Sequence, residues 1–230
     1  MDDTGTQFVD LIYSFMGNEF GSLDDFFGST PSLKPEDCIC HSGGAIGADT
    51  VFEKVGAEYG VKTNAYSYKT KKHNSPNKFE ISEEDYAEGV VQINKANRRL
   101  GRYGVQKYMN LLARNWAQVK YSKQVFAVGM IVDPGKRDEK GYRNGWKQQI
   151  VSGGTGYAVM MAVLNNRDVY VYEQNIKSWF RWSAISERFV KMDGTPKILD
   201  KNFAGIGTRE INTDGVAAIR SLYRETFGER

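Results

Sequence analysis

The chain of 230 residues is long enough to form one α/β domain with a core of ordinary size. Hydrophobic residues make up 40% of the chain and aromatic residues 13%, which excludes global disorder. The 31 basic and 28 acidic residues leave a net charge of +3, which by itself does not predict binding to nucleic acid.

Residues 1–36 are expected to form an N-terminal helix and a connection. Apolar side chains recur at helical spacing over residues 8–16. Gly, Pro and Ser residues are spread over residues 17–37, which is typical of a connection. The acidic start of the chain lacks a continuous apolar run, so neither a signal peptide nor a membrane anchor is expected. An apolar helix face needs a partner surface, which favours packing on the body of the protein or a homo-oligomer.

Residues 37–230 are expected to form a single Rossmann-like domain, in which helices flank a parallel sheet. A short strand at residues 38–40, a helix over 49–59 and a strand over 61–68 make a βαβ unit, which implies parallel strands. The helix ends at Gly60, and glycine favours a C-terminal cap.

The same alternation continues along the chain. Helices are predicted over residues 82–99 and about 104–121, and the apolar residues 124–132 predict a buried strand. After a polar insertion at about 130–151 we expect a glycine turn and helix at 151–166, a strand at 168–173, a helix at 176–192, and a last strand, glycine turn and helix within 201–227. The insertion is rich in Lys, Arg, Tyr and Trp, which fits either a lid over an anionic ligand or an ordinary surface hairpin.

Glycine-bearing turns follow three of the predicted strands: "SGGAIGAD" at 42–49, "SGGTG" at 152–156 and "GIGTRE" at 205–210. Glycine lets a backbone approach a ligand closely, and the first N–H groups of a helix are unpaired donors at the positive end of its dipole. Because loops at the carboxyl ends of parallel strands line one crevice, the three turns are expected to meet there. They fit a phosphate or ribose site, and they also fit tight turns with close helix packing.

Four stretches together resemble the SLOG superfamily of Rossmann-like proteins, which includes the Smf/DprA DNA-processing proteins and the Lonely Guy phosphoribohydrolases. They are "HSGGAIGAD", "LLARNWAQVKYSKQVFAVG", "SGGTGYAVMMA" and "FAGIGTRE". In phage and bacterial relatives the "GIGSRE"-like strand comes first, whereas here it lies near the end of the chain. The resemblance therefore implies a circularly permuted SLOG-type arrangement of phage type, in which the strand near Phe203 lies beside the strand near Ile39.

The turns and the resemblance together predict one set of ligand-binding residues. The set comprises Ser42, Gly43, Gly44, Asp49, Arg114, Asn115, Gly153, Gly154, Thr155, Gly156, Tyr157, Gly205, Gly207, Thr208, Arg209 and Glu210.

Particular roles follow for the polar members of this set. Arg114 stands where the Lonely Guy motif has an arginine, so the resemblance implies a contact with the substrate phosphate; the alternative is a solvated helix arginine. Asn115 is expected to hydrogen-bond a ribose or a base. Arg209 is expected to pair with a phosphate and Glu210 to accept from ribose hydroxyls, or else the two bridge each other or cap the next helix. Asp49 is equally explained as the first-turn acid of a helix.

The resemblance breaks down at the position that would carry catalysis. Lonely Guy phosphoribohydrolases carry "PGGxGTxxE", whose glutamate is implied in cleaving the N-glycosidic bond, whereas residues 157–160 here are Tyr-Ala-Val-Met. Glycosidic cleavage needs a carboxylate or an equivalent group. Cleavage is therefore expected either to be absent or to use Glu210 or Asp49 as the acid.

Two functions follow from these residues and the resemblance. The chain is expected to bind a nucleotide-derived small molecule without cleaving it, and a viral protein of this kind would sequester a host-defence signalling nucleotide, such as an ADP-ribose derivative or a cyclic nucleotide. The alternative is an N-glycosidase or phosphoribohydrolase that acts on a nucleoside monophosphate.

No nucleic acid, metal or cofactor is expected as a partner. The basic loops at 68–78 and 134–147 lack a repeat of aromatic and basic residues along a strand, which disfavours single-stranded DNA binding by analogy with DprA. Two cysteines and two histidines are too few to predict a structural zinc site. The cysteine usage fits a reducing cytoplasm, that of the host if the protein is viral.

Overall fold

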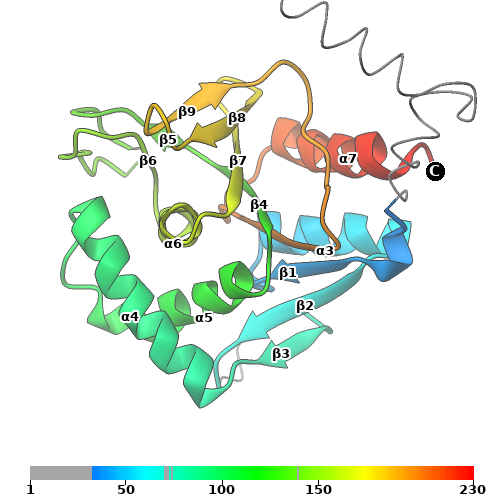
Figure 1. Cartoon of the computed structure of the whole chain (residues 1–230), viewed down its shortest axis with the longest axis horizontal. Helices are drawn as coiled ribbons and strands as arrows, with labels where there is room; N and C mark the ends of the chain where they lie inside the picture. Colours follow the sequence, from blue (N-terminus) through cyan, green and yellow to red (C-terminus); the bar gives the residue numbers. More distant parts are fainter. Residues whose placement is uncertain (1–32, 70–72, 74, 139) are drawn as a thin grey trace, which may run out of the picture. The chain divides into compact units, whose positions relative to one another are not determined.

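The computed structural model describes residues 33–69, 73, 75–138 and 140–230, and residues 33–230 form one compact unit. The helix predicted over residues 8–16 and most of the connection after it lie outside the described residues. The described part has the predicted α/β fold, in which helices flank an eight-stranded and mostly parallel sheet (Figure 1).

The secondary-structure elements are named here by their labels in Figure 1. The strands of the main sheet, in spatial order, are β3 (Lys78–Glu80), β2 (Lys62–Ser67), β1 (Ile39–Ser42), β10 (Asn202–Gly207), β4 (Gln124–Gly129), β7 (Asp168–Glu173), β8 (Ser178–Ser183) and β9 (Arg188–Lys191). The helices are α3 (Ala48–Tyr59), α4 (Glu83–Leu100), α5 (Met109–Lys120), α6 (Thr155–Leu164) and α7 (Thr213–Phe227), with 3₁₀ turns η1 (Pro35–Asp37) and η2 (Gln106–Tyr108). None of the described helices is long and apolar enough to cross a membrane.

The predicted βαβ unit is confirmed by β1, α3 and β2, whose strands pair in parallel. Gly60 ends α3 in the left-handed conformation, with φ 87°, as expected of a glycine cap. Ser82 caps α4, because its Oγ accepts a hydrogen bond from the N–H of Asp85 at 3.0 Å. These helix ends are therefore set by local sequence signals.

The last strand of the chain, β10, lies in the middle of the sheet and runs parallel to β1 on one side and β4 on the other. Cys40 pairs with Phe203, so the expected contact between the strands near Ile39 and Phe203 is confirmed. Residues 203–206 are buried, and the C-terminal βα unit therefore completes the core instead of extending an edge of the sheet.

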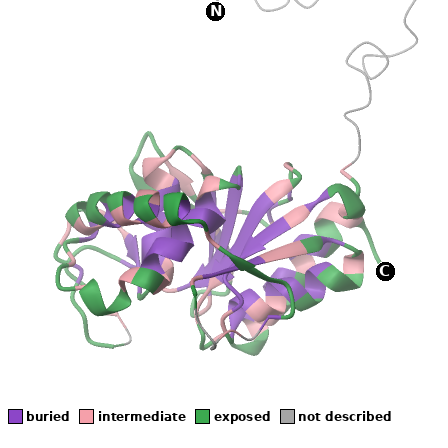
Figure 2. Ribbon diagram, turned by 90° about the horizontal axis from the view of Figure 1, so that it is seen from below, coloured by how far each residue is buried: buried purple, intermediate pink, exposed green. Residues whose placement is uncertain are grey.

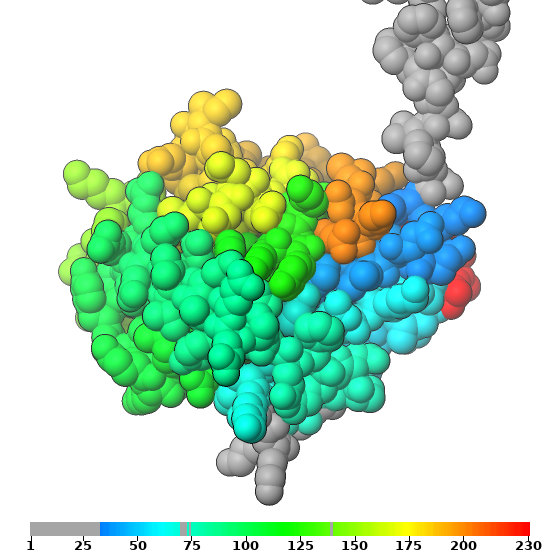
Figure 3. Space-filling model, turned by 60° about the horizontal axis from the view of Figure 1, so that its bottom comes forward, coloured from blue at the N-terminus to red at the C-terminus, as the bar shows by residue number. Residues whose placement is uncertain are grey.

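Two layers of helices bury the two faces of the sheet, as the buried strands in Figure 2 show. Val125 and Ala127 of β4 face the core formed with α4, α5 and α6, whereas Phe126 and Val128 face α3 and α7. In the space-filling view, atoms of α4 and α5, in teal and green, form a large part of the visible surface (Figure 3). Burial on both faces explains the continuous apolar run in this strand, which is typical of parallel sheets.

Residues 176–192, predicted to be a helix, instead form the antiparallel strands β8 and β9, so that prediction was wrong. Phe180 and Trp182 pack against the core under α6, whereas Trp179, which precedes Phe180, packs against the opposite core. This period of two suits a strand, and aromatic residues favour strands. Lys177 and Glu187 adopt positive φ angles of 53° and 47° in the turns on either side of β8.

The insertion forms an antiparallel hairpin from β5 (Ile131–Val132) and β6 (Ile150–Val151). The Arg137 and Arg143 side chains donate to carbonyl oxygens within the insertion, at 2.6 and 3.2 Å. The Trp146 indole packs against Gly101 at the end of α4, so closely that an added Cβ there would lie 2.3 Å from the indole Nε1. The insertion therefore packs on the end of α4, and these two cations are bonded to its own backbone.

His41 is buried between strands with both ring nitrogens bonded. Nε2 lies 3.2 Å from Asn202 Oδ1, which only accepts, so Nε2 donates and Nδ1 accepts from the Tyr66 hydroxyl at 2.9 Å. The Tyr66 ring also stacks on the imidazole, with ring centroids 5.8 Å apart. Burial lowers the pKa of His41 because it disfavours the charged ring, and the Asn202 contact offsets this only in part.

We predict that stability falls as the pH drops through the range in which an unfolded histidine gains its proton, near pH 6.5. The unfolded chain then binds a proton that the folded chain does not, so the free energy of unfolding decreases by up to about 1.4 kcal/mol per pH unit. Urea unfolding between about pH 7.5 and 5 measures the slope. His41→Gln should reduce it, and an equal slope in both proteins would contradict this assignment.

Candidate functional site

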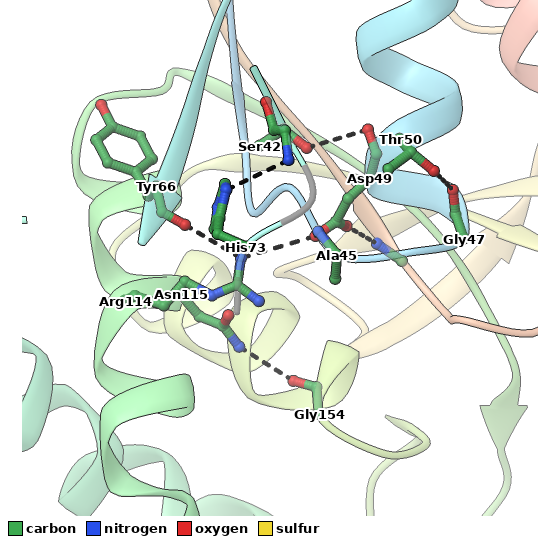
Figure 4. A network of polar contacts seen from close by, with 12 residues as sticks. Ser42, Ala45, Gly47, Asp49, Thr50, Tyr66, His73, Arg114, Asn115 and Gly154 are labelled. Atoms are coloured by element: carbon green, nitrogen blue, oxygen red, sulfur yellow. Dashed lines mark hydrogen bonds and ion pairs between the residues drawn. The ribbon is translucent and has the colours of Figure 1, made fainter. Parts of the chain in front are cut away.

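Asp49 joins the turn after β1 to the turn after β10 at the carboxyl edge of the sheet (Figure 4). Its Oδ2 accepts from the N–H of Ala45 at 3.3 Å, and its Oδ1 accepts from the N–H of Gly207 at 3.2 Å. The N–H of Ala48 donates to the Thr208 carbonyl at 3.0 Å, which adds a second link between the two turns. Asp49 is therefore more than a first-turn acid, because its carboxylate holds two of the predicted turns together.

Several glycines of these two turns serve close packing. An added Cβ at Gly47, where φ is +110°, would lie 2.4 Å from the Thr208 carbonyl oxygen. An added Cβ at Gly205 would lie 2.4 Å from the Phe52 ring, and one at Gly207 would lie 2.6 Å from the Val128 carbonyl oxygen. The Ser42 hydroxyl is also engaged in this packing, donating to the Gly205 carbonyl at 2.9 Å.

Arg114 of α5 reaches this junction from the other helix layer. Arg114 and Asp49 are only 6% and 5% exposed, and Nη1 lies 3.7 Å from Asp49 Oδ2 and 3.5 Å from the Tyr66 carbonyl oxygen. Gly43 packs on the guanidinium, since an added Cβ would lie 1.6 Å from Nη1. Nε and Nη2 of Arg114 have no acceptor among the described residues. The structure therefore places a buried cation with unused donors at the edge of the sheet.

Burial and the neighbouring charges shift the pKa values of Arg114 and Asp49 in opposite directions. Burial lowers the pKa of Arg114, the Asp49 carboxylate raises it, and the Arg209 guanidinium lowers it again. Burial raises the pKa of Asp49, and Arg114 and the backbone N–H groups offset part of this. Because Arg209 acts on Arg114, the two predicted phosphate contacts bring their positive charges near one another.

The "SGGTG" turn leads into α6 and is the most open of the three. Gly153 has a positive φ of 63°, and added Cβ atoms at Gly153 and Gly154 would meet nothing within 4 Å. The N–H groups of Gly153, Gly154 and Thr155 have no acceptor in the part of the chain that the structure describes. Asn115 connects α5 to this turn, donating from Nδ2 to the Gly154 carbonyl at 3.4 Å. The open donors of a helix N-terminus thus lie next to the residue that follows Arg114.

Arg102, which was not predicted from the sequence, binds backbone carbonyl groups in and just before the "SGGTG" turn. Its Nη1 donates to the Gly153 carbonyl at 2.7 Å and its Nη2 to the Val151 carbonyl at 3.2 Å. Its guanidinium also lies over the Tyr157 ring, 5.5 Å from the centroid. These contacts tie the backbone of the turn to the end of α4. No spacing signal connects Arg102 with a turn 51 residues later.

Two residues predicted in this turn have internal partners. Tyr157 is buried, and its hydroxyl donates to Asn97 Oδ1 at 2.7 Å. Gly156 packs against the strand before it, since an added Cβ would lie 2.0 Å from the Val151 carbonyl oxygen. Thr155 is partly exposed at the first position of α6.

The third turn presents Arg209 and Glu210 as exposed side chains. No ion pair connects the two in the described part of the chain, and Asn212 caps α7 instead, accepting from the Gly215 N–H at 2.8 Å. Thr208 Oγ1 accepts from the Glu210 N–H at 3.1 Å, which orders the backbone of this turn.

His73 and Ser75, which follow β2, lie against the first turn, and the sequence did not predict this contact. The His73 ring packs on Gly44, where an added Cβ would lie 2.4 Å from Cε1, and its Nδ1 accepts from the Ser75 N–H at 3.4 Å. The buried carboxylate of Glu53 accepts from the Ser75 hydroxyl and the Asn77 amide, both at 2.6 Å. His73 Nε2 is shielded from solvent and has no partner among the described residues.

Comparisons of the chain with models of known protein families, with curated proteins and with solved structures find no match. Its function is therefore inferred from the geometry of the site.

We predict that Arg114→Met lowers the free energy of unfolding by about 3–5 kcal/mol, because it leaves the Asp49 charge buried without its partner. Combining it with Asp49→Asn removes that charge and should restore part of the loss. Urea unfolding measures both variants. Arg220→Met is the control, since Arg220 forms an exposed ion pair with Glu58 and its loss should leave stability nearly unchanged. Equal effects of the two arginine substitutions would contradict the assignment.

Proposed function

We propose that this chain binds a phosphate-bearing, nucleotide-derived small molecule at the carboxyl edge of its sheet, between Arg114 and the N-terminus of α6. The observation that carries the proposal is Arg114, a residue only 6% exposed, whose guanidinium has Nε and Nη2 without acceptors among the described residues. A desolvated guanidinium with free donors is most stable when an anion accepts from it.

The α6 N-terminus supplies a second set of donors for the same anion. Three backbone N–H groups, of Gly153, Gly154 and Thr155, have no acceptor in the described part, and the glycines leave room for a close approach. A helix N-terminus favours negative charge through its dipole and its unpaired N–H groups. Asn115 contacts this turn and follows Arg114 directly on α5, which supports the assignment of both donor sets to one site. Arg209 adds positive charge near Arg114.

In this proposal the ligand is bound and not cleaved. Residue 160 is Met where the hydrolase motif has glutamate, and both oxygens of the Asp49 carboxylate accept backbone N–H groups beside Arg114. These contacts leave Asp49 poorly suited to attack or protonate a ligand. The position of β10 beside β1 supports a circularly permuted SLOG-type arrangement, which is the second part of the proposal.

We predict that adenosine monophosphate or ADP-ribose binds the full chain and that Arg114→Lys weakens the binding at least tenfold. Lysine keeps a positive charge beside Asp49 but lacks the planar set of donors, and a hydrogen bond to a charged group contributes about 1.5–3 kcal/mol. Isothermal titration calorimetry measures the affinity. Arg99→Lys, at an exposed position on α4, is the matched control. Binding of neither compound, or equal binding by both variants, would refute the proposed site.

We also predict that the bound nucleotide is recovered intact. Mass spectrometry of the small molecules released on denaturation, after incubation of the native protein with nucleoside monophosphates, should show no free base. Free base together with ribose phosphate would establish a glycosidase instead. Loss of that turnover in Glu210→Gln would then assign the acid.

A further inference from the structure

A cavity of about 230 Å³ opens at the carboxyl ends of β4, β7 and β10. It is smaller than the about 300–1,000 Å³ typical of sites that enclose a whole drug-sized ligand, so it suits one part of a larger molecule. Its walls come from Gly129 and Met130 at the end of β4, from residues 173–175 at the end of β7 and from the turn after β10.

The chemistry of this cavity is opposite to that of the phosphate site. Its lining includes the carboxylates of Glu173 and Glu210 and the amides of Asn175 and Asn212, and it includes no Lys, Arg or His among the described residues. The exposed Glu210 carboxylate disfavours a phosphate here by like-charge repulsion. It favours groups that donate hydrogen bonds, such as hydroxyls and amines.

The walls of the cavity are held by their own hydrogen bonds. Gln174 Oε1 accepts from the Asn212 N–H at 2.7 Å, and its Nε2 donates to the Glu210 carbonyl at 3.3 Å. Glu173 accepts from the backbone N–H groups of Ile131 and Asn175. The Glu210 carboxylate and the Asn175 amide have no partner in the part of the chain that the structure describes, so they remain for a ligand.

The cavity adjoins the proposed phosphate site. Gly129 lines the cavity, and an added Cβ there would lie 3.8 Å from Thr155 Cγ2, at the first residue of α6. Thr208 also lines it, and the Thr208 carbonyl accepts from Ala48 at the start of α3. The Gly129 contact places one wall of the cavity beside the first residue of α6.

We infer that the cavity binds the hydroxyl-bearing sugar of a ligand whose phosphate lies at the α6 N-terminus, with Glu210 and Asn175 accepting from and donating to vicinal hydroxyls. This inference rests on the proposed function and makes it more specific. The preferred class is a ribose phosphate unit with free vicinal hydroxyls, and the cavity does not receive a second phosphate.

The test compares ribose 5-phosphate, 2-deoxyribose 5-phosphate and inorganic phosphate by calorimetry on the full chain. We expect ribose 5-phosphate to bind about tenfold more tightly than the deoxy sugar, and the deoxy sugar at least as tightly as phosphate. Glu210→Gln and Asn175→Ala should each reduce the preference for ribose and leave the affinity for phosphate unchanged or slightly higher. Both positions are exposed, so neither substitution threatens the fold.

Glu84→Gln, at an exposed position on α4, is the matched control and should leave all three affinities unchanged. Equal affinity for the two sugars, or a ribose preference that survives in both Glu210→Gln and Asn175→Ala, would overturn the inference while phosphate binding stands. Absence of binding by all three compounds, together with the absence of nucleotide binding, would overturn the proposed function and this inference with it.

Discussion

The buried ion pair between Asp49 and Arg114 is the contact on which the rest of the site depends. Asp49 lies in the first turn of α3, and Arg114 comes from α5 on the opposite face of the sheet. Their contact joins the two helix layers at the edge where β1 and β10 end, and the Asp49 carboxylate also orders the backbone of both turns. Because desolvation offsets much of the attraction in a buried pair, its main effect is positional. It holds a guanidinium at the edge of the sheet with donors left over.

The charge around this edge is divided between two sides. Arg114, Arg209 and the α6 N-terminus bring positive charge and N–H donors to one side, while the carboxyl-bearing residues Glu173 and Glu210 line the neighbouring cavity. A ligand with an anionic end and a hydroxyl-bearing end satisfies both sides at once. The net charge of the chain, +3, does not show this separation, because the positive and the negative side chains at this edge cancel when the charges of all residues are added.

The glycine-rich turns resemble one another in sequence and differ in physical role. Gly47, Gly205 and Gly207 allow backbone segments and the Phe52 ring to approach closely, and their missing side chains are replaced by protein atoms. No described atom lies within 4 Å of a Cβ added at Gly153 or Gly154, so among the described residues the backbone of this turn is open to a ligand. Arg102 and Asn115 bind the carbonyls of that turn. The donors of the α6 N-terminus are thus held in place before any ligand arrives.

Most of the fold was predictable from the sequence because strands, glycine turns and helix caps are local signals: Gly60 and Ser82 end or begin helices through contacts within a few residues. The hairpin at 176–192 was not predicted, because the spacing of its aromatic residues fits a helix as well as a strand. Only the packing of alternate side chains against the two opposite cores identifies it as a strand.

For the site, the sequence by itself determined which turns lie at the carboxyl edge of a parallel sheet and which residues there are polar. Only the tertiary structure decided that the Asp49 carboxylate accepts hydrogen bonds from two turns and that Arg114 is buried with free donors. It also decided that Arg102 and His73 contact turns that are far from them in the sequence. The physical reason is that burial and hydrogen-bond partners depend on contacts between distant segments. A motif of a few residues cannot encode those contacts.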